Sequence, residues 1–181
     1  MRQRLQQAFE EATLVRIHRR FEEHGPRGYV VGMGPQLFLL LRISDEVWFD
    51  GFSVLRIRDV SGIDAPDPYA EFLEAALRAR GECVERAPDV QLWNMATVLK
   101  SLPGAYPVIV LHQGDLDSSV CWIGAIVSVA GDSVELLGID PAARWDESPT
   151  SYPIDSISRV DFGGDYEGAL ALVGGSPQVK P

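Results

Sequence analysis

The chain has 181 residues, 46% of them hydrophobic, which is the length of one large domain or two small ones with an ordinary globular composition. Its formal net charge is −10, and residues 87–181 account for most of it with 4 basic and 12 acidic side chains. An acidic surface repels the phosphate backbone of nucleic acids, so the charge disfavours that class of partner. The longest apolar runs, such as residues 37–41, are strand-length, so the sequence predicts no membrane-spanning segment.

The first half of the chain predicts a helix followed by five short strands. Residues 2–12 have the apolar periodicity of an amphipathic helix. Apolar and β-branched runs predict strands at 14–20, 28–33, 36–43, 46–49 and 52–57. Asp50-Gly51 predicts a two-residue hairpin between the last two of these runs. Residues 67–81 then predict a helix that Asp67-Pro68 begins and Gly81 ends.

The second half predicts the same order of elements. A linker at 82–88 leads into a helix at 89–102, and strands follow from 106 to 162. Their central hairpin is expected to turn at Gly131-Asp132. A closing helix is expected at 165–173, and the tail 174–181 is expected to be disordered.

The two halves are copies of each other in sequence, because the stretch from Leu14 to Ala76 reappears from Val108 to Val173. Such an internal repeat determines the architecture before any finer prediction. The alignment pairs these residues: His18 with His112, Gly32 with Gly124, Ile57 with Ile154, Ser61 with Ser158, Asp64 with Asp161, Tyr69 with Tyr166 and Leu73 with Leu170.

One spacing indicates the kind of repeat. Ile57, Val60 and Ile63 are three residues apart, which fits a strand end, one tight 3-10 turn and a short closing strand. Small five-stranded barrels turn their last corner in this way. We therefore expect a mainly β (α+β) protein with two five-stranded small barrels, each preceded and followed by a short helix. Residues 1–81 would form the first repeat and residues 89–173 the second.

A helix leading into a strongly bent five-stranded barrel resembles the Sm-like fold, within the wider class of SH3-like small barrels. The resemblance lies in the order of elements. Sm proteins typically carry Asn or Asp before Gly in their RNA-binding loops, and Phe49-Asp50-Gly51 is a loose echo of that pattern, without a counterpart in the second repeat. The whole chain also resembles a group of uncharacterised bacterial proteins built from such a tandem, which implies no particular activity.

Metal, cofactor and nucleophile signals are weak in this sequence. Cys83 and Cys121 have no CxxC spacing and are expected to be free thiols in a reducing compartment. The charged first residues lack the pattern of a signal peptide, so we expect a cytoplasmic protein. His18 and His112 occupy equivalent strand positions without carboxylate or cysteine at ligand spacing, so we interpret both as structural. We expect no cofactor and no metal site.

One candidate binding surface lies in the first repeat. Alternation along the strands places Arg56 and Arg58 on the outer side, with Arg42 on a neighbouring strand. Trp48 and Phe49 would add aromatic rings, and a surface of rings and cations suits single-stranded nucleic acid. Salt bridges to the acidic second half explain the same arginines without a ligand.

A second candidate site is the acidic loop of the second repeat. Asp140, Asp146 and Glu147 offer oxygen ligands for a hard cation, although they lack the spacing of a dedicated calcium loop. A solvated loop anchored by Trp145 is the alternative interpretation.

Three classes of function are compatible with the sequence. The leading hypothesis is a cytoplasmic, non-enzymatic binding or interaction module that binds a partner protein or itself, for example through exposed edge strands. The second is an Sm-like RNA-binding protein that uses the arginine and aromatic face. The third is an enzyme with a site between the barrels, although no residue motif names a reaction.

Overall fold

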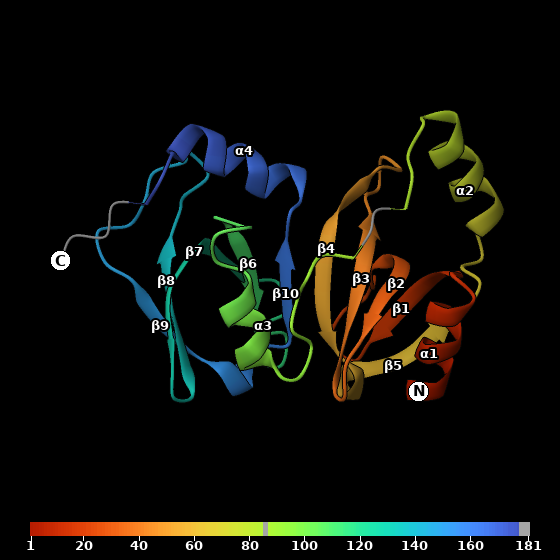
Figure 1. The fold of residues 1–181 in the computed structure, drawn as a ribbon, viewed down its shortest axis with the longest axis horizontal. Helices are drawn as coiled ribbons and strands as arrows, with labels where there is room; N and C mark the ends of the chain where they lie inside the picture. The colour runs from red at the N-terminus through yellow and green to blue at the C-terminus, as the bar shows by residue number, and fades with distance from the viewer. Residues whose placement is uncertain (85–86, 178–181) are drawn as a thin grey trace.

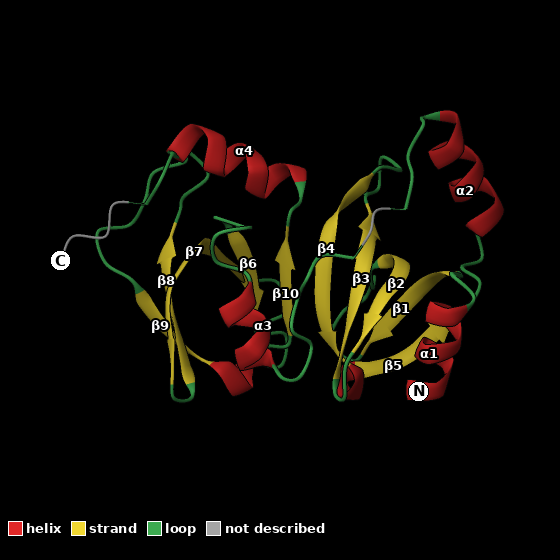
Figure 2. Cartoon of the chain, viewed as in Figure 1, coloured by secondary structure: helices red, strands yellow, loops and turns green. Residues whose placement is uncertain are grey.

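The computed structural model describes residues 1–84 and 87–177, which form one antiparallel sheet of ten strands with four α-helices and two 3-10 turns (Figure 1). Figure 2 shows α1 and α2 beside the first repeat, and α3 and α4 beside the second. None of the helices described is long and apolar enough to cross a membrane. The linker residues 85–86 and the tail residues 178–181 lie outside the described part.

The strands and helices follow the order of the sequence. The strands are β1 (Leu14–Arg19), β2 (Arg27–Met33), β3 (Leu37–Ile43), β4 (Phe49–Arg56), β5 (Val60–Asp64), β6 (Ile109–His112), β7 (Cys121–Ala130), β8 (Ser133–Gly138), β9 (Thr150–Pro153) and β10 (Arg159–Phe162). The helices are α1 (Arg2–Glu10), α2 (Ala70–Ala79), α3 (Met95–Ser101) and α4 (Asp165–Gly174). The 3-10 turns are η1 (Ile57–Asp59) and η2 (Ile154–Ser156).

The expectation of two closed five-stranded barrels is wrong, whereas the mainly β character is confirmed. The strand order is β5-β1-β2-β3-β4-β10-β6-β7-β8-β9, a single open sheet. The strands of each repeat keep the same internal order. The repeats join where β4 pairs with β10, with Val54 opposite Val160 and Phe52 opposite Phe162. We call this strand pair and the side chains on it the joint.

Burial explains why β4 pairs across the joint. Phe52, Val54, Val160 and Phe162 all belong to one core cluster, which contains residues of both repeats and the inner face of α3. The rings of Phe52 and Phe162 stack at 5.7 Å between centroids. Closing each barrel on itself would separate these apolar side chains, so pairing across the joint buries more apolar surface. A second core cluster, around Leu5 of α1, belongs to the first repeat alone.

Several element predictions are confirmed, but three are wrong, including the strand expected at 46–49, because residues 45–48 form a turn and β4 begins at Phe49. The two 3-10 turns stand at the isoleucine spacing that predicted them, and the β7–β8 hairpin turns at Gly131-Asp132. The helix expected at 89–102 begins only at Met95, because the side chain of Asn94 accepts a hydrogen bond from the backbone of Thr97 and caps it there. Asp50-Gly51 lies inside β4 rather than in a hairpin turn.

Strand register corrects the alignment of the repeats in one block. Arg42, which aligns with Gly138, pairs with Gly28, whereas Gly138 pairs with Gly124. Gly124 is therefore the counterpart of Gly28, not of Gly32. A β-bulge follows each of these glycines at the same distance, between Val30 and Gly32 in the first repeat and between Ile126 and Ser128 in the second. The duplicated bulge shows that both repeats bend their second strand alike.

Candidate functional site

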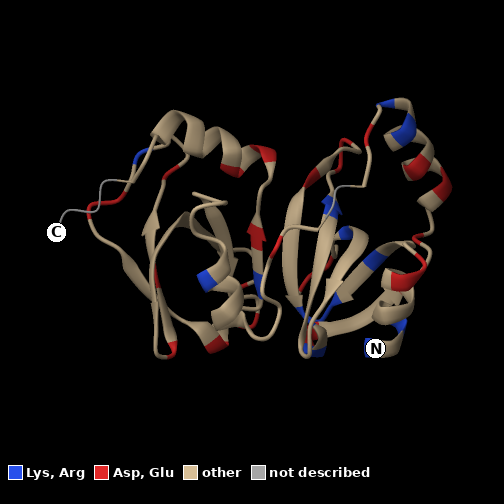
Figure 3. Cartoon of the chain, viewed as in Figure 1, with Lys and Arg blue, Asp and Glu red and all other residues tan. Residues whose placement is uncertain are grey.

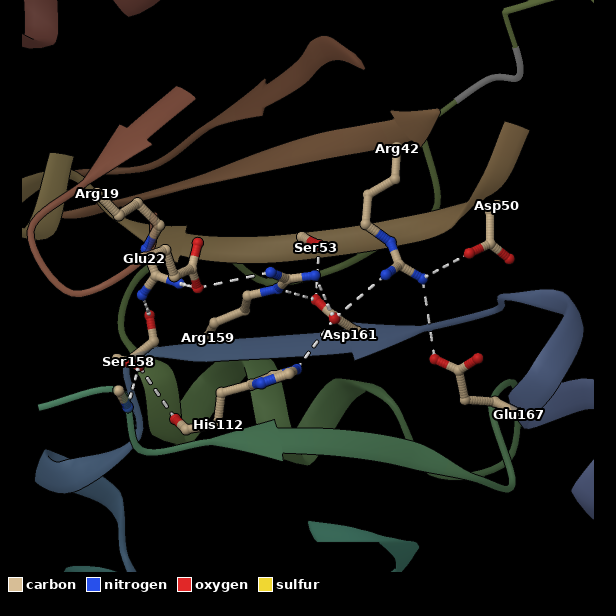
Figure 4. A network of polar contacts seen from close by, with 11 residues as sticks. Arg19, Glu22, Arg42, Asp50, Ser53, His112, Ser158, Arg159, Asp161 and Glu167 are labelled. Carbon is tan, nitrogen blue, oxygen red and sulfur yellow. Dashed lines mark hydrogen bonds and ion pairs between the residues drawn. The ribbon is translucent and has the colours of Figure 1, made fainter. Parts of the chain in front are cut away.

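The joint carries a network of charged side chains on the face opposite its apolar core (Figure 4). Asp161 of β10 lies at its centre. Its carboxylate accepts hydrogen bonds from Ser53 Oγ at 2.6 Å, Arg159 Nε at 2.6 Å and Arg42 Nη1 at 3.3 Å. His112 Nε2 lies 3.1 Å from the same carboxylate. Four strands, β3, β4, β6 and β10, thus converge on one buried acid.

The network extends along the joint in both directions. Glu22 contacts Arg19 and lies 3.6 Å from Arg159 Nη1, and Arg19 Nη2 donates to the carbonyl of Ser158. At the other end Arg42 meets two further acids, Asp50 at 3.4 Å and Glu167 at 3.9 Å. Ion pairs therefore cross between the repeats at both ends of β10.

The electrostatics of Asp161 follow from burial and its partners. Burial opposes ionisation, but the charge of Arg159, the hydrogen bond from His112 and the charge of Arg42 outweigh it and hold the pKa of Asp161 well below its usual range. Burial raises the pKa of Glu167, which has only Arg42 as a cationic partner among the causes of its shift. Asp161 is the ionised anchor of the joint.

The two histidines that the sequence places at equivalent positions each meet the equivalent aspartate. His18 Nε2 lies 2.7 Å from Asp64 Oδ2, as His112 lies near Asp161. The His18 and Asp64 side chains are 43% and 41% exposed, whereas those of His112 and Asp161 are 22% and 4% exposed. The same pair is thus a surface contact on the outer side of the first repeat and a buried contact in the joint. No group of three or more metal-binding side chains occurs among residues 1–84 and 87–177.

Cys121 pairs with His112 across β6 and β7. Burial and the negative charge of Asp161 raise the pKa of its thiol. A nucleophilic cysteine needs a lowered pKa, because the thiolate is the reactive form. The arrangement of Cys121, His112 and Asp161 therefore does not support a Cys–His–Asp mechanism.

The predicted arginine and aromatic face is not assembled as one surface. Arg42 lies in the joint network. Arg56 is buried and donates from its two terminal nitrogens to the carbonyls of Ile154 and Asp155, each at 2.9 Å. Both arginines thus bind the second repeat, Arg42 through a salt bridge as the alternative interpretation proposed and Arg56 through backbone carbonyls. The chain supplies their partners itself.

The two aromatic residues of that face, Trp48 and Phe49, lie at the opposite end of β4 from Arg58. Arg80 covers the ring of Trp48 at 4.2 Å, and Phe49 packs against Tyr29. Arg58 is exposed over 66% of its side chain. Phe49 and Arg56 stand at opposite ends of β4, which places them roughly 20 Å apart at about 3.3 Å per residue.

The difference between Arg56 and Arg58 gives a first testable prediction. Replacing Arg56 by alanine leaves two carbonyls without their charged donor, and we expect it to cost about 2–3 kcal/mol of unfolding free energy. Arg58→Ala is the matched control, and we expect a change within about 0.5 kcal/mol because its side chain is exposed. Urea unfolding followed by circular dichroism measures both. Equal effects would contradict the assigned contacts of Arg56.

The acidic loop of the second repeat is held by internal contacts. Asp140 accepts hydrogen bonds from the backbone nitrogens of Ala142 and Arg144 and pairs with the Arg144 guanidinium, and the backbone hydrogen bond from Arg144 leads the contacts that lower its pKa. Trp145 donates from Nε1 to the carbonyl of Gly174 at 3.0 Å. Asp146 packs over Gly138, and its backbone nitrogen donates to the Gly138 carbonyl. Glu147 is exposed. These contacts favour the anchored-loop interpretation over a cation site.

A groove of about 690 Å³ crosses the joint at the end of β4. Its floor is apolar and includes Ile57, Met95 and Ile154, and its rim carries Arg58, Asp132 and Asp155. The rim has charges of both signs, and the buried guanidinium of Arg56 beneath it is already engaged with carbonyls. The lining contains neither a histidine nor a cysteine. The groove therefore has no recognisable catalytic arrangement.

The outer face of α4 exposes several large apolar side chains. Leu170 points inward and is buried, whereas Leu172 and Val173 are 86% and 75% exposed and Tyr166 is 51% exposed. Tyr166, Ala169 and Val173 follow the helical spacing of a single stripe. Globular proteins rarely leave such contiguous apolar stripes to solvent without a binding role. The equivalent helix α2 repeats the feature with exposed Tyr69 and Phe72.

Acidic groups stand at both ends of the α4 stripe (Figure 3). At its start, the backbone nitrogen of Asp165 donates to Asp50 Oδ1, which places the Asp50 carboxylate at the first residue of α4. At its end, the Trp145–Gly174 contact holds the acidic loop with Asp146 and Glu147 beside the helix. An apolar stripe with acidic ends is complementary to an apolar segment with basic ends.

Comparison of the sequence with known protein families, with curated proteins and with solved structures finds no match.

Proposed function

We propose that this protein is a non-enzymatic protein-interaction module in which two fused repeats form a platform for the apolar outer face of α4. The observation that carries the proposal is the exposed apolar face of α4, which includes Tyr166, Leu172 and Val173 and lies between two acidic ends. The expected partner is a protein that presents an apolar helix or strand with Lys or Arg at its ends. The duplicated apolar face of α2 supports the same type of function.

Fewer observations support the alternative that the protein binds RNA. Its two central arginines, Arg42 and Arg56, are bound to the second repeat, and the net charge of −10 opposes phosphate. Binding that collapses between low and moderate salt and is lost in the double variant Arg56→Ala/Arg58→Ala would revive it. The enzyme alternative lacks a named nucleophile, base or cofactor among the side chains that line the groove or the joint.

The proposal places the protein in the cytoplasm. Cys83 and Cys121 are both free and exposed. Exposed free thiols persist in the reducing cytosol and are oxidised in secretory compartments.

A capture experiment tests the proposed function. We expect the tagged chain to retain a stoichiometric protein partner from the lysate of its host, and the double variant Leu172→Glu/Val173→Glu to lose it by at least tenfold. Two charges on the stripe would oppose burial against an apolar partner. Both side chains are exposed in the free chain. Quantitative mass spectrometry measures the partner, and absorbance at 260 nm measures co-purified nucleic acid.

Leu116→Glu is the matched control, because Leu116 is 72% exposed and lies outside α4. The control should capture the partner as the wild type does, with or without nuclease. Nuclease-sensitive capture, or equal loss in the control, would contradict a protein partner on α4.

A further inference from the structure

The pairing of β4 with β10 in the joint shows how one repeat binds a strand of the other. A second copy of the chain would be added to the sheet in the same way. The backbone nitrogen of Ile57 donates to Gln36 at 2.9 Å, on the β3 side. Backbone groups of successive residues in an antiparallel strand point to opposite neighbours. The backbone N–H and C=O groups therefore point away from β3 at Arg56, Val54 and Phe52. Two of these residues, Val54 and Phe52, pair with β10.

The corresponding outer edge of the second repeat is β9. The backbone nitrogen of Ile154 donates to Asp132 at 2.8 Å, which repeats the bond of Ile57. By the same alternation, the backbone groups of residues 149, 151 and 153 point to the free edge of β9. These positions correspond to Phe52, Val54 and Arg56 in the first repeat. Two of these positions are Pro149 and Pro153, which have no N–H to donate. Only Ser151 keeps an outward donor.

The other free edge, β5, is covered in a different way. Ile63 pairs with Ile17, whose backbone nitrogen donates to Pro26 on the far side of β1. The polar groups of Ile63 therefore face outward, and Arg4 Nη2 donates to its carbonyl at 2.7 Å. Arg4 belongs to α1, which Leu5 anchors in the first core. A charged side chain and a helix at an edge are both known protections against strand addition.

We infer that the two outer edges are sealed, so that the tandem is a closed two-repeat unit and a second copy cannot add to it by strand pairing. If these edges were open, the contact between two copies would be heterologous, because the β9 edge of one copy would meet the β5 edge of the next. Such contacts produce rings or open filaments. The sheet therefore stops at two repeats, because Pro149, Pro153 and Arg4 prevent a further strand from pairing with its edges. This inference does not rest on the proposed function of α4.

Sedimentation velocity over a hundredfold range of concentration tests the inference. We expect the wild type to keep the mass of one chain, 19.9 kDa, throughout the range. The triple variant Arg4→Ala/Pro149→Thr/Pro153→Thr restores the outward donors and frees the Ile63 carbonyl. We expect its mean mass to at least double at the highest concentration.

Two further variants keep the test decisive. Adding Ser151→Pro to the triple variant removes an outward donor and should return it to one chain, whereas aggregation of a misfolded variant would persist. Pro141→Thr, at an exposed loop proline, should behave as the wild type. A triple variant that stays at 19.9 kDa, or whose association survives Ser151→Pro, would overturn the inference. So would a wild-type multimer that Ser151→Pro dissociates.

Discussion

Replacing Asp161 by asparagine is expected to lower the free energy of unfolding by roughly 3–5 kcal/mol, because it removes the anion from a buried cluster of cations. Arg159 and Arg42 would remain in the joint without the charge that compensates them. Within the described residues, Arg159 would keep only Glu22, at 3.6 Å. Arg42 would keep Asp50 at 3.4 Å and Glu167 at 3.9 Å. The loss falls on the contact that unites the two repeats, so both should unfold together.

The duplicated aspartate provides the matched control. Asp64→Asn removes the same type of contact to a histidine, but on the surface, where such a pair is worth about 0–1 kcal/mol. Urea unfolding at pH 7 compares the two variants with the wild type. If Asp161→Asn and Asp64→Asn cost the same, the joint network would not be a significant source of stability.

The pKa of Asp161 also fixes the sign of its pH dependence. Because its native pKa lies below the unfolded value of about 3.9, the native state binds fewer protons than the unfolded chain. The stabilisation is therefore complete above that value and is lost as the pH falls through the native pKa. We expect the difference between wild type and Asp161→Asn to stay constant from pH 7 to about pH 5 and to shrink below about pH 4.

Gly28→Ala should be the second severe change, with an expected cost of about 3 kcal/mol or more from backbone strain and overpacking together. The φ angle of Gly28 is +153°, which side-chain-bearing residues rarely adopt. A Cβ atom there would also lie 1.9 Å from the carbonyl oxygen of Leu41. Backbone on the neighbouring strand would have to move, and that strand carries Arg42.

Two other glycines separate the clash from the general effect of adding a methyl group. At Gly124, the counterpart in the second repeat, a Cβ would lie 2.1 Å from the Leu137 carbonyl, so Gly124→Ala should also destabilise. Gly168 lies within α4 with nothing near its Cβ position, and Gly168→Ala should stabilise by roughly 0.5–1 kcal/mol. Thermal unfolding of the three variants shows whether each substitution raises or lowers the stability relative to the wild type. A neutral Gly28→Ala would contradict the close approach of β2 and β3.

Local patterns predicted the elements of each repeat well, because spacing and turn residues act within a few positions. The three-residue spacing of Ile57, Val60 and Ile63 predicted a 3-10 turn, and that turn appears in both repeats. The closure of the barrels could not be predicted in the same way. Alternating apolar residues such as Phe52 and Val54 are equally suited to a partner strand in their own repeat and to one in the other repeat.

The joint network was only partly accessible from the sequence. The repeat alignment identified His18, His112, Asp64 and Asp161 as equivalent positions, yet it did not show that each histidine meets its aspartate. That contact follows from the pairing of the first strand of a repeat with its fifth strand.

Five members of the network were missed altogether: Arg19, Glu22, Ser53, Arg159 and Glu167. Arg159 and Asp161 did carry a usable signal, since they alternate with the apolar Val160 and Phe162 on one short strand. A strand with charges on one face and large apolar groups on the other is a candidate for an interface between repeats. The remaining four depend on tertiary contacts that no local pattern encodes.

The central position of β10 has a consequence for synthesis on the ribosome. Ser53 of β4 and its partner Asp161 are 108 residues apart, so β4 emerges long before the strand that completes it. At typical elongation rates of about 5–20 residues per second, the nascent first repeat displays an unpaired apolar strand for roughly 5–20 seconds. During that interval the growing chain offers the kind of edge that its finished form does not have, and neighbouring nascent chains on one message would be the nearest competitors for it.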